Sequence, residues 1–255
     1  MNSTRRVAIV TGAAGGIGAA VAKRLARDGM AVGIVDLAEA DCAGTVEAIR
    51  STGGTATAVA ADIADETAVT RAVAEVSAAL GPPTVLVNNA GFNRTATITE
   101  LTVAQWDAVV GVNLRAPFLF TRLVAPSMIE AGWGRIVNLS SISAHGTAGR
   151  SDYASAKAGI LGFTKSLALE LGPHGVTANA IAPGFVVSGM TRATARGLSR
   201  DFAEHQRIAA ESIPVRRVGQ PEDIAHTAAY LVHPDAGFVN GQVVYVAGGP
   251  VSTGT

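Results

Sequence analysis

The chain has 255 residues, which suits one α/β domain with a substantial core. Its 20 basic and 20 acidic residues balance, so no overall field attracts nucleic acid or an anionic membrane, and we expect neither as a partner. One cysteine excludes an internal disulfide, residues 1–12 lack the apolar run of a signal peptide, and no window is expected to span a bilayer, so the sequence predicts a cytoplasmic protein without a metal site.

Short β-branched runs alternate with longer alanine-rich segments along the chain. Strands are expected at 7–10, 31–36, 55–60, 84–89, 135–140, 176–182 and 242–247. Several are apolar on both faces, as parallel strands between two helical layers must be. Helical patterns fill the intervals, among them 17–29, 66–81, 113–131 and 153–171. The alternation predicts an α/β fold, a doubly wound parallel sheet (Rossmann fold) with helices on both faces.

One segment, from about 185 to 213, interrupts this alternation. It favours helix, yet it carries many charges and few apolar residues. In doubly wound sheets, ligands bind outside the carboxyl ends of the strands. We therefore expect this segment to be a small helical lid over a ligand site. No linker or repeat divides the chain, so the sequence predicts one domain over 1–255.

A glycine-rich turn, TGAAGGIG at 11–18, follows the first strand directly. Gly12, Gly16 and Gly18 permit tight backbone geometry and close approach of a pyrophosphate, and the next helix supplies N–H donors. The second strand ends at Asp36, whose carboxylate would accept bonds from ribose hydroxyls and repel a 2′-phosphate. Leu37 follows, with no neighbouring arginine. This pattern predicts NAD rather than NADP as the cofactor.

Three motifs, TGAAGGIG, NNAG at 88–91 and YASAK at 153–157, make the chain resemble the classical short-chain dehydrogenase/reductase family. The likeness covers essentially the whole chain, through NAIAPGFV at 179–186 to NGQVVYVAGG at 240–249. It implies hydride transfer between a nicotinamide and a secondary alcohol or ketone, and a homotetramer as the assembly. Alanine-rich helices with apolar residues on more than one face fit such an assembly.

The resemblance also implies a set of cofactor contacts. Asp62 is expected at the adenine, Asn89 in the groove, and Ser188, where relatives more often have threonine, at the nicotinamide. The complete expected set is Gly12, Gly15, Gly16, Ile17, Gly18, Asp36, Leu37, Asp62, Ile63, Asn89, Ala90, Gly91, Tyr153, Lys157, Pro183, Gly184, Val186 and Ser188.

Tyr153 and Lys157 lie four residues apart, so a helix brings them to one face. A free tyrosine, with a pKa of about 10, is a poor base at neutral pH. A nearby lysine ammonium would lower that pKa by favouring the phenolate. We therefore expect Tyr153 to be the general acid/base. The resemblance adds that Lys157 also binds the nicotinamide ribose and that Asn113 helps to hold a water in a proton relay.

A serine that polarises the substrate oxygen is the remaining catalytic group that the resemblance implies. In relatives it lies thirteen residues before the tyrosine, which points to Ser140. Alignment on the strand RIVNLSS points instead to Ser141, followed by a loop one residue short. Because loops absorb deletions more readily than strands change register, we favour Ser141.

The substrate is less clearly indicated. Candidate contacts are His145, Arg150, Asp152, Phe92, Asn93, Arg94, Met190, Leu198 and Phe202, a mixture that suggests a medium-sized, partly apolar ketone or secondary alcohol.

Two alternative functions stay open. The first is a 3-oxoacyl reductase acting on acyl carrier protein or coenzyme A thioesters. Asp36 opposes the NADPH that such enzymes normally use, and MIEAGWGR before the fifth strand lacks their basic cluster, with only Arg135 there. The second is a non-catalytic dinucleotide-binding scaffold. It is disfavoured because both Tyr153 and Lys157 are present.

Overall fold

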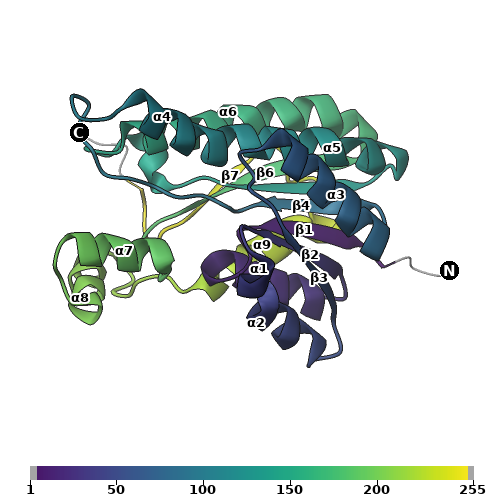
Figure 1. Ribbon diagram of the computed structural model, residues 1–255, viewed down its shortest axis with the longest axis horizontal. Coiled ribbons are helices and arrows are strands. Elements are labelled where there is room, and N and C mark those ends of the chain that lie inside the picture. Colours follow the sequence, from purple (N-terminus) through teal and green to yellow (C-terminus); the bar gives the residue numbers. More distant parts are fainter. Residues whose placement is uncertain (1–4, 252–255) are drawn as a thin grey trace.

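Seven parallel strands form one sheet in a computed structural model that describes residues 5–251 (Figure 1). The strand order is β3-β2-β1-β4-β5-β6-β7, so the direction of winding reverses between β1 and β4. The strands are β1 (Val7–Thr11), β2 (Ala31–Asp36), β3 (Thr55–Ala60), β4 (Pro83–Asn88), β5 (Gly134–Leu139), β6 (Val176–Pro183) and β7 (Val243–Val246). Such a reversal opens a crevice at the carboxyl edge of the sheet.

Helices cover both faces of this sheet. One layer holds α1 (Gly16–Arg27), α2 (Glu39–Arg50) and α9 (Pro221–Val232), and the other holds α3 (Glu66–Leu80), α5 (Ala116–Glu130) and α6 (Ser151–Leu171). Strand side chains alternate between the layers: Val10 joins the core of the first and Ile9 that of the second. The predicted doubly wound α/β fold is confirmed.

A single long helix spans Val103–Glu130, whereas the sequence indicated a helix starting only at 113. It consists of α4 (Val103–Val110), a π-helical segment (Gly111–Arg115) and α5. By length and composition it is apolar enough to cross a membrane, so the expectation that no window is long enough was wrong. Its Leu119, Phe120 and Val124 are instead buried in the core beneath the sheet.

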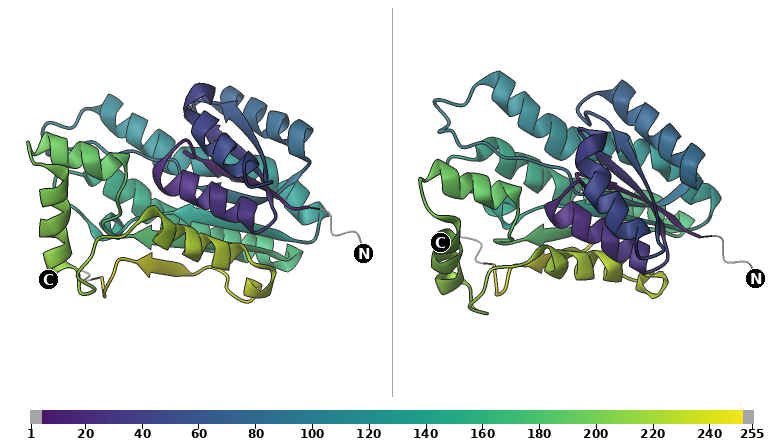
Figure 2. Two further views of the ribbon diagram at one scale, coloured as in Figure 1. Left: turned by 90° about the horizontal axis from the view of Figure 1, so that it is seen from below. Right: turned by 60° about the horizontal axis from the view of Figure 1, so that its bottom comes forward.

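The segment between β6 and α9 forms two short helices, α7 (Gly189–Gly197) and α8 (Phe202–Ser212). Capping residues define their starts: Ser188 accepts a hydrogen bond from the Thr191 amide, and Asp201 accepts from the Ala203 and Glu204 amides. Figure 2 shows both helices standing away from the sheet, beyond the carboxyl ends of its strands. We call α7 and α8 the lid helices below.

Candidate active site

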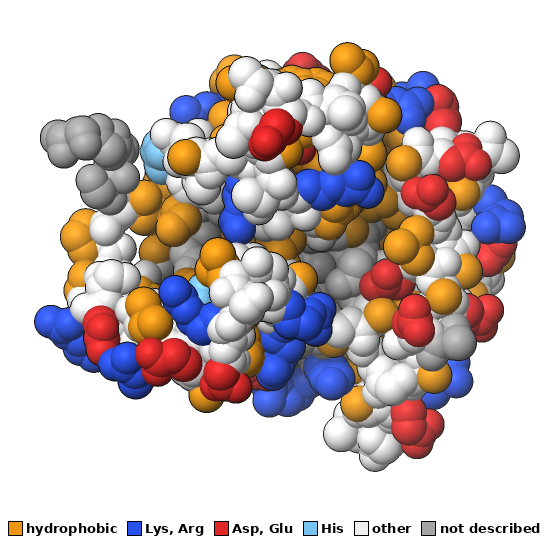
Figure 3. Space-filling model, turned by 60° about the vertical axis from the view of Figure 1, so that its left-hand side comes forward, with side chains coloured by type: hydrophobic (Ala, Val, Ile, Leu, Met, Phe, Trp, Pro, Cys, Tyr) orange, Lys and Arg blue, Asp and Glu red, His pale blue; other side chains and the backbone are white. Residues whose placement is uncertain are grey.

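A cavity of about 1150 Å³ opens at the carboxyl edge of the sheet, beneath the lid helices. Figure 3 views the molecule from the side on which the lid helices stand. The expected cofactor and catalytic residues that line the cavity are Gly12, Gly15, Gly16, Ile17, Asp36, Leu37, Asp62, Ile63, Asn89, Ala90, Gly91, Ser141, Tyr153, Lys157, Pro183, Gly184, Val186 and Ser188. Of the expected set, only Gly18 and Asn113 lie behind its wall.

The glycine-rich turn between β1 and α1 forms one wall of this cavity. Gly12 and Gly16 have φ values of +65° and +54°, which side chains rarely adopt. A methyl group on Gly18 would lie 2.1 Å from the Gly12 carbonyl oxygen, so the turn closes only with glycine there. A methyl group on Gly15, by contrast, would meet nothing within 4 Å, because Gly15 faces the open cavity.

Asp36, at the end of β2, lies beside this turn. Its carboxylate accepts hydrogen bonds from the Ala14 and Leu37 amides, both at 2.9 Å. Asp62 lies on the same side and accepts a bond from the Ala64 amide at 3.0 Å. Among the described residues, the lysine and arginines that line the cavity lie elsewhere in it: Lys157 near Tyr153, and Arg150 and Arg200 near the lid helices. This end of the cavity is therefore negatively charged.

Asn89 braces the turn as well as lining the groove. Its side-chain amide donates to the Thr11 and Gly12 carbonyl oxygens at 2.9 and 3.0 Å. The Thr11 hydroxyl in turn accepts from the amides of Asn89 and Ala90. Thr11 was not among the site residues predicted from the sequence. The feature of the sequence that could have indicated its role is a hydroxyl side chain at the end of an otherwise apolar strand.

Tyr153 and Lys157 lie on one face of α6, both almost fully buried. Lys157 Nζ donates a 2.7 Å hydrogen bond to the Leu139 carbonyl oxygen and lies 5.6 Å from the centre of the Tyr153 ring. Burial lowers the pKa of Lys157 to about 7. Burial also raises the pKa of Tyr153, while its hydrogen bond with Ser141 and the charge of Arg150 act in the opposite direction. The effect of burial is the largest, so Tyr153 is favoured in its neutral, protonated form. The spacing of Tyr153 and Lys157 in the sequence had suggested a lowered tyrosine pKa instead.

The two candidate serines face different surroundings. Ser140 is buried, and its hydroxyl donates to the Lys157 carbonyl oxygen at 2.8 Å. Both serines line the cavity. The Ser141 hydroxyl accepts from the Ser143 amide at 3.1 Å and is close enough to Tyr153 to lower the pKa of the tyrosine. Only Ser141 therefore has its hydroxyl beside that of Tyr153.

Asn113 lies in the π-helical segment, behind Lys157. Its side-chain amide donates to the carbonyl oxygens of Phe92 and Val109, each at 2.9 Å, while its Oδ1 is buried without a partner among the described residues. A methyl group on Gly91 would lie 2.5 Å from that oxygen and 3.4 Å from Lys157 Nζ. The glycine thus leaves the unsatisfied acceptor and the amine open to a common space.

A buried polar chain that the sequence analysis missed supports the strands beneath this site. Asn88 donates to Asn138 at 2.8 Å, and Asn138 donates to Thr164 at 2.9 Å. Asn138 is the polar residue within the otherwise apolar run RIVNL, which was the available signal. These hydrogen bonds join β4 and β5 to α6, the helix that carries Tyr153.

Some of the candidate substrate contacts line the cavity and others lie outside it. Arg150, Phe92, Asn93 and Met190 line the cavity, whereas the other candidates do not. His145 hydrogen-bonds with the Tyr245 hydroxyl at 2.8 Å instead. Asp152 is buried, with one oxygen accepting from the Tyr153 amide and the other without a partner among the described residues. The lid helices add Arg200 and His205 to the lining, and the sequence analysis had not proposed these.

Comparison with known proteins agrees with this geometry. A family model described as enoyl-(acyl carrier protein) reductase matches residues 12–250. The short-chain reductase protein NovJ of Streptomyces niveus is 47% identical over 247 residues, which cover 97% of this chain and 94% of that protein. The chain belongs to the short-chain dehydrogenase/reductase family.

Further relatives cover the chain to a similar extent. The 3-oxoacyl-[acyl-carrier-protein] reductase FabG of Staphylococcus epidermidis is 39% identical over 248 residues, covering 95% of this chain and 97% of that protein. A solved dehydrogenase structure from Agrobacterium tumefaciens has a TM-score of 0.90 at 35% identity and covers 97% of this chain and 96% of its own. Membership in this family makes the chain an oxidoreductase of alcohol or ketone groups that uses a nicotinamide dinucleotide.

The cavity fits such a cofactor. Gly15 leaves space against the helix N-terminus where a pyrophosphate is accommodated in dinucleotide-binding folds, and Asp36 stands where a ribose is bound. The unpartnered Asn113 oxygen and the Lys157 amine lie at the other end of the same cavity. Within residues 5–251, no three His, Cys, Asp or Glu side chains are grouped as a metal site would require.

Proposed function

We propose that this protein is an NAD-dependent oxidoreductase that interconverts a ketone and a secondary alcohol, with Tyr153 as general acid/base assisted by Lys157, Ser141 and Asn113. The observation that carries the proposal is that Ser141, Tyr153 and Lys157 line one cavity, with the unpartnered Asn113 oxygen close to Lys157 behind them. The cofactor supplies or accepts the hydride.

In the direction of reduction, the Ser141 hydroxyl donates a hydrogen bond to the substrate oxygen, which gains negative charge as its carbon is reduced. Tyr153 gives its proton to that oxygen. A raised tyrosine pKa suits this role, because the side chain holds a proton at neutral pH. In oxidation the same two groups act in reverse, and Tyr153 accepts the alcohol proton.

Lys157 and Asn113 restore the proton on Tyr153. A lysine with a pKa of about 7 changes its protonation near neutrality, so it can pass on a proton at modest cost. The Asn113 oxygen, buried without a protein partner and close to Lys157, is an acceptor for a water in this relay. Both groups act through Tyr153 in this step.

The preference for NAD rests on Asp36. Its carboxylate is fixed by two backbone amides at the cavity wall, and Leu37 beside it is uncharged. A 2′-phosphate at this end would meet negative charge with no arginine or lysine to balance it among the lining residues.

Reduction of 3-oxoacyl thioesters is the second candidate, because the FabG relatives carry that activity in their name. One feature of this chain opposes a carrier-protein substrate. Arg135, the one basic residue of MIEAGWGR, is the second residue of β5; it is buried and donates to the Gly134 and Pro234 carbonyl oxygens. It is not exposed to meet an acidic carrier.

A turnover screen with NADH and NADPH against varied ketones and 3-oxoacyl thioesters tests this proposal. We expect oxidation of NADH by ketones, with weaker use of NADPH. Absence of oxidation with every ketone and thioester would favour the scaffold alternative, and reaction with thioesters alone would favour the second candidate.

A homotetramer in the cytoplasm completes the proposal. Large apolar side chains stay exposed on the outer helices, including Val103 on α4, Phe118 on α5 and Leu169 on α6. Burial of these faces between copies would remove them from water. Light scattering should give four times the chain mass, and a monomer would contradict this part.

A further inference from the structure

The half of the cavity under the lid helices carries positive charge. Arg150 lines it from the segment before α6, and Arg200 and His205 line it from the lid. The only acidic residues among the lining residues are Asp36 and Asp62, at the end that fits adenosine. A ligand bound under the lid therefore meets cations without an acidic counterpart.

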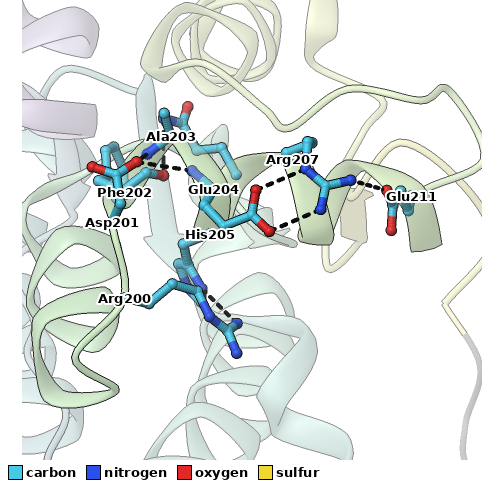
Figure 4. Close-up of polar contacts among 9 residues, drawn as sticks. Arg200, Asp201, Phe202, Ala203, Glu204, His205, Arg207 and Glu211 are labelled. Carbon is cyan, nitrogen blue, oxygen red and sulfur yellow. Dashed lines mark hydrogen bonds and ion pairs between the residues drawn. The ribbon is translucent and has the colours of Figure 1, made fainter.

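The carboxylates of the lid helices already have hydrogen-bond partners other than the arginines of the cavity. Glu204 receives two bonds from Arg207, at 2.7 and 2.8 Å, and Glu211 pairs with the same guanidinium. Asp201 caps α8 through the Ala203 and Glu204 amides. In Figure 4 this row of paired side chains runs along α8, while Arg200 and His205 lie together apart from it.

Neither cavity arginine has a carboxylate as a direct side-chain partner within residues 5–251. Arg150 makes one long side-chain bond, 3.4 Å to the Thr194 hydroxyl on α7. Arg200 contacts His205 at 3.5 Å, and its charge also helps to lower the pKa of Glu204, whose carboxylate Arg207 holds. Neither forms an ion pair with a described acid. Two other arginines near the lid have partners: Arg217 pairs with Asp223, and Arg192 lies over the Phe202 ring at 4.2 Å.

Arg150 also lies near the chemistry. It lines the same cavity as Tyr153 three residues before it in the chain, and its charge favours the phenolate form of that tyrosine. The wall beyond is apolar, with Met190 and Ile208 from the lid helices. A substrate that uses both features has an apolar body and an oxyanion on the lid side of its carbonyl group. Planar guanidinium groups suit carboxylate and phosphate oxygens.

We propose that Arg150 and Arg200 bind an oxyanion of the substrate, so that this enzyme prefers ketones and secondary alcohols that carry a carboxylate or phosphate. This inference rests on the proposed function, since it places the substrate carbonyl at Tyr153. A carboxylate of the substrate itself and the phosphates of a coenzyme A thioester present the same chemistry to these arginines.

Matched charged and neutral ligands test the inference. The probes are a homologous series of methyl-ketone carboxylates, each with its primary amide, and 3-oxobutyryl-coenzyme A with its phosphate-free N-acetylcysteamine analogue. Calorimetric titration into the Tyr153→Phe variant saturated with NADH measures binding without turnover. Arg150→Gln and Arg200→Gln are added to that variant, with Arg196→Gln as control because Arg196 is exposed on α7 outside the cavity.

We expect a charged member to bind about tenfold to a hundredfold more tightly than its neutral partner, as is usual for hydrogen bonds to charged groups. Each cavity variant should reduce that ratio, and Arg196→Gln should leave it unchanged. Preference for carboxylates over amides identifies a small acid, and preference for the coenzyme A thioester alone identifies its phosphates. Equal binding of charged and neutral members, or a ratio that survives in Arg150→Gln and Arg200→Gln, would overturn the inference.

Parallel turnover measurements with the wild-type enzyme separate this inference from the proposed function. If the methyl ketones that carry an amide are reduced as fast as those that carry a carboxylate, the anion preference is refuted and the proposed function stands. If no probe oxidises either cofactor, the proposed function fails, and the binding ratio still decides whether the arginines hold an oxyanion.

Discussion

Ser140 donates a hydrogen bond to the carbonyl oxygen of Lys157, one turn after Tyr153 on α6. The bond ties the end of β5 to α6 and commits the Ser140 hydroxyl to the helix backbone, although Ser140 also lines the cavity. Its neighbour Ser141 is left to face Tyr153. Adjacent residues of an extended chain point in opposite directions, so only one of the two serines can reach the substrate.

Alanine variants of the two serines should therefore behave differently. Ser141→Ala removes a donor to the substrate oxygen, and we expect kcat to fall about a hundredfold to a thousandfold. Ser140→Ala should keep most of kcat and lose about 1 kcal/mol of unfolding free energy with its hydrogen bond. Steady-state kinetics and urea unfolding measure the two effects. Loss of turnover in Ser140→Ala alone would reverse the assignment.

Much of the fold follows from strand patterning. The runs AVGIVD and TATAVA occupy β2 and β3 with the expected ends. The expected ranges of β1 and β6 differ by one residue at one end, and those of β4, β5 and β7 by one residue at each end. Buried β-branched runs between alanine-rich helices leave few alternatives. The π-helical segment around Asn113 was beyond this reasoning, because hydrophobic periodicity does not register one extra residue in a turn.

The residues of the site could be predicted from the sequence only where they belong to a recognisable motif. Asn89 was expected in the groove, but its bonds to the Thr11 and Gly12 carbonyl oxygens depend on how β1 and β4 end side by side. Arg200 was passed over because nothing local separates it from the other lid arginines. Its position became distinctive only when the partners of Glu204 and Glu211 were known.

Glycine substitutions should separate stability from cofactor binding. An alanine at Gly18 would clash with the Gly12 carbonyl oxygen, so Gly18→Ala should lose about 1–3 kcal/mol of unfolding free energy. Gly15→Ala has space for its methyl group within the protein, but the group enters the cavity. It should unfold near the wild-type denaturant concentration and bind NADH more weakly. Equal stability losses in both variants would contradict the turn geometry.

The buried Lys157 should make stability depend on pH. Its pKa in the folded protein is about 7, below the usual 10.5, so between these values the unfolded chain binds more protons. The stability of the cofactor-free protein relative to Lys157→Met should therefore rise from pH 7 towards pH 10, by at most about 1.4 kcal/mol per pH unit. Chemical unfolding at several pH values tests this, with Lys165→Met on the same helix as control. A flat difference would show that Lys157 is not titrating in this range.

Removing the Asp36 charge should weaken the discrimination between cofactors. In Asp36→Asn, we expect the ratio of kcat/KM for NADPH to that for NADH to rise at least about tenfold, because one close negative charge is lost. Asp41→Asn, at an exposed position of α2 outside the cavity, should leave the ratio unchanged. An unchanged ratio in Asp36→Asn would mean that another feature selects the cofactor.

The central claim is that Tyr153 transfers the proton while hydride moves to or from the nicotinamide. The most direct measurement compares Tyr153→Phe with wild type for ketone-dependent NADH oxidation and for NADH binding by fluorescence titration. We predict that kcat falls about a hundredfold to ten-thousandfold while the Kd for NADH stays within about twofold. Turnover at the wild-type rate in Tyr153→Phe would contradict the mechanism.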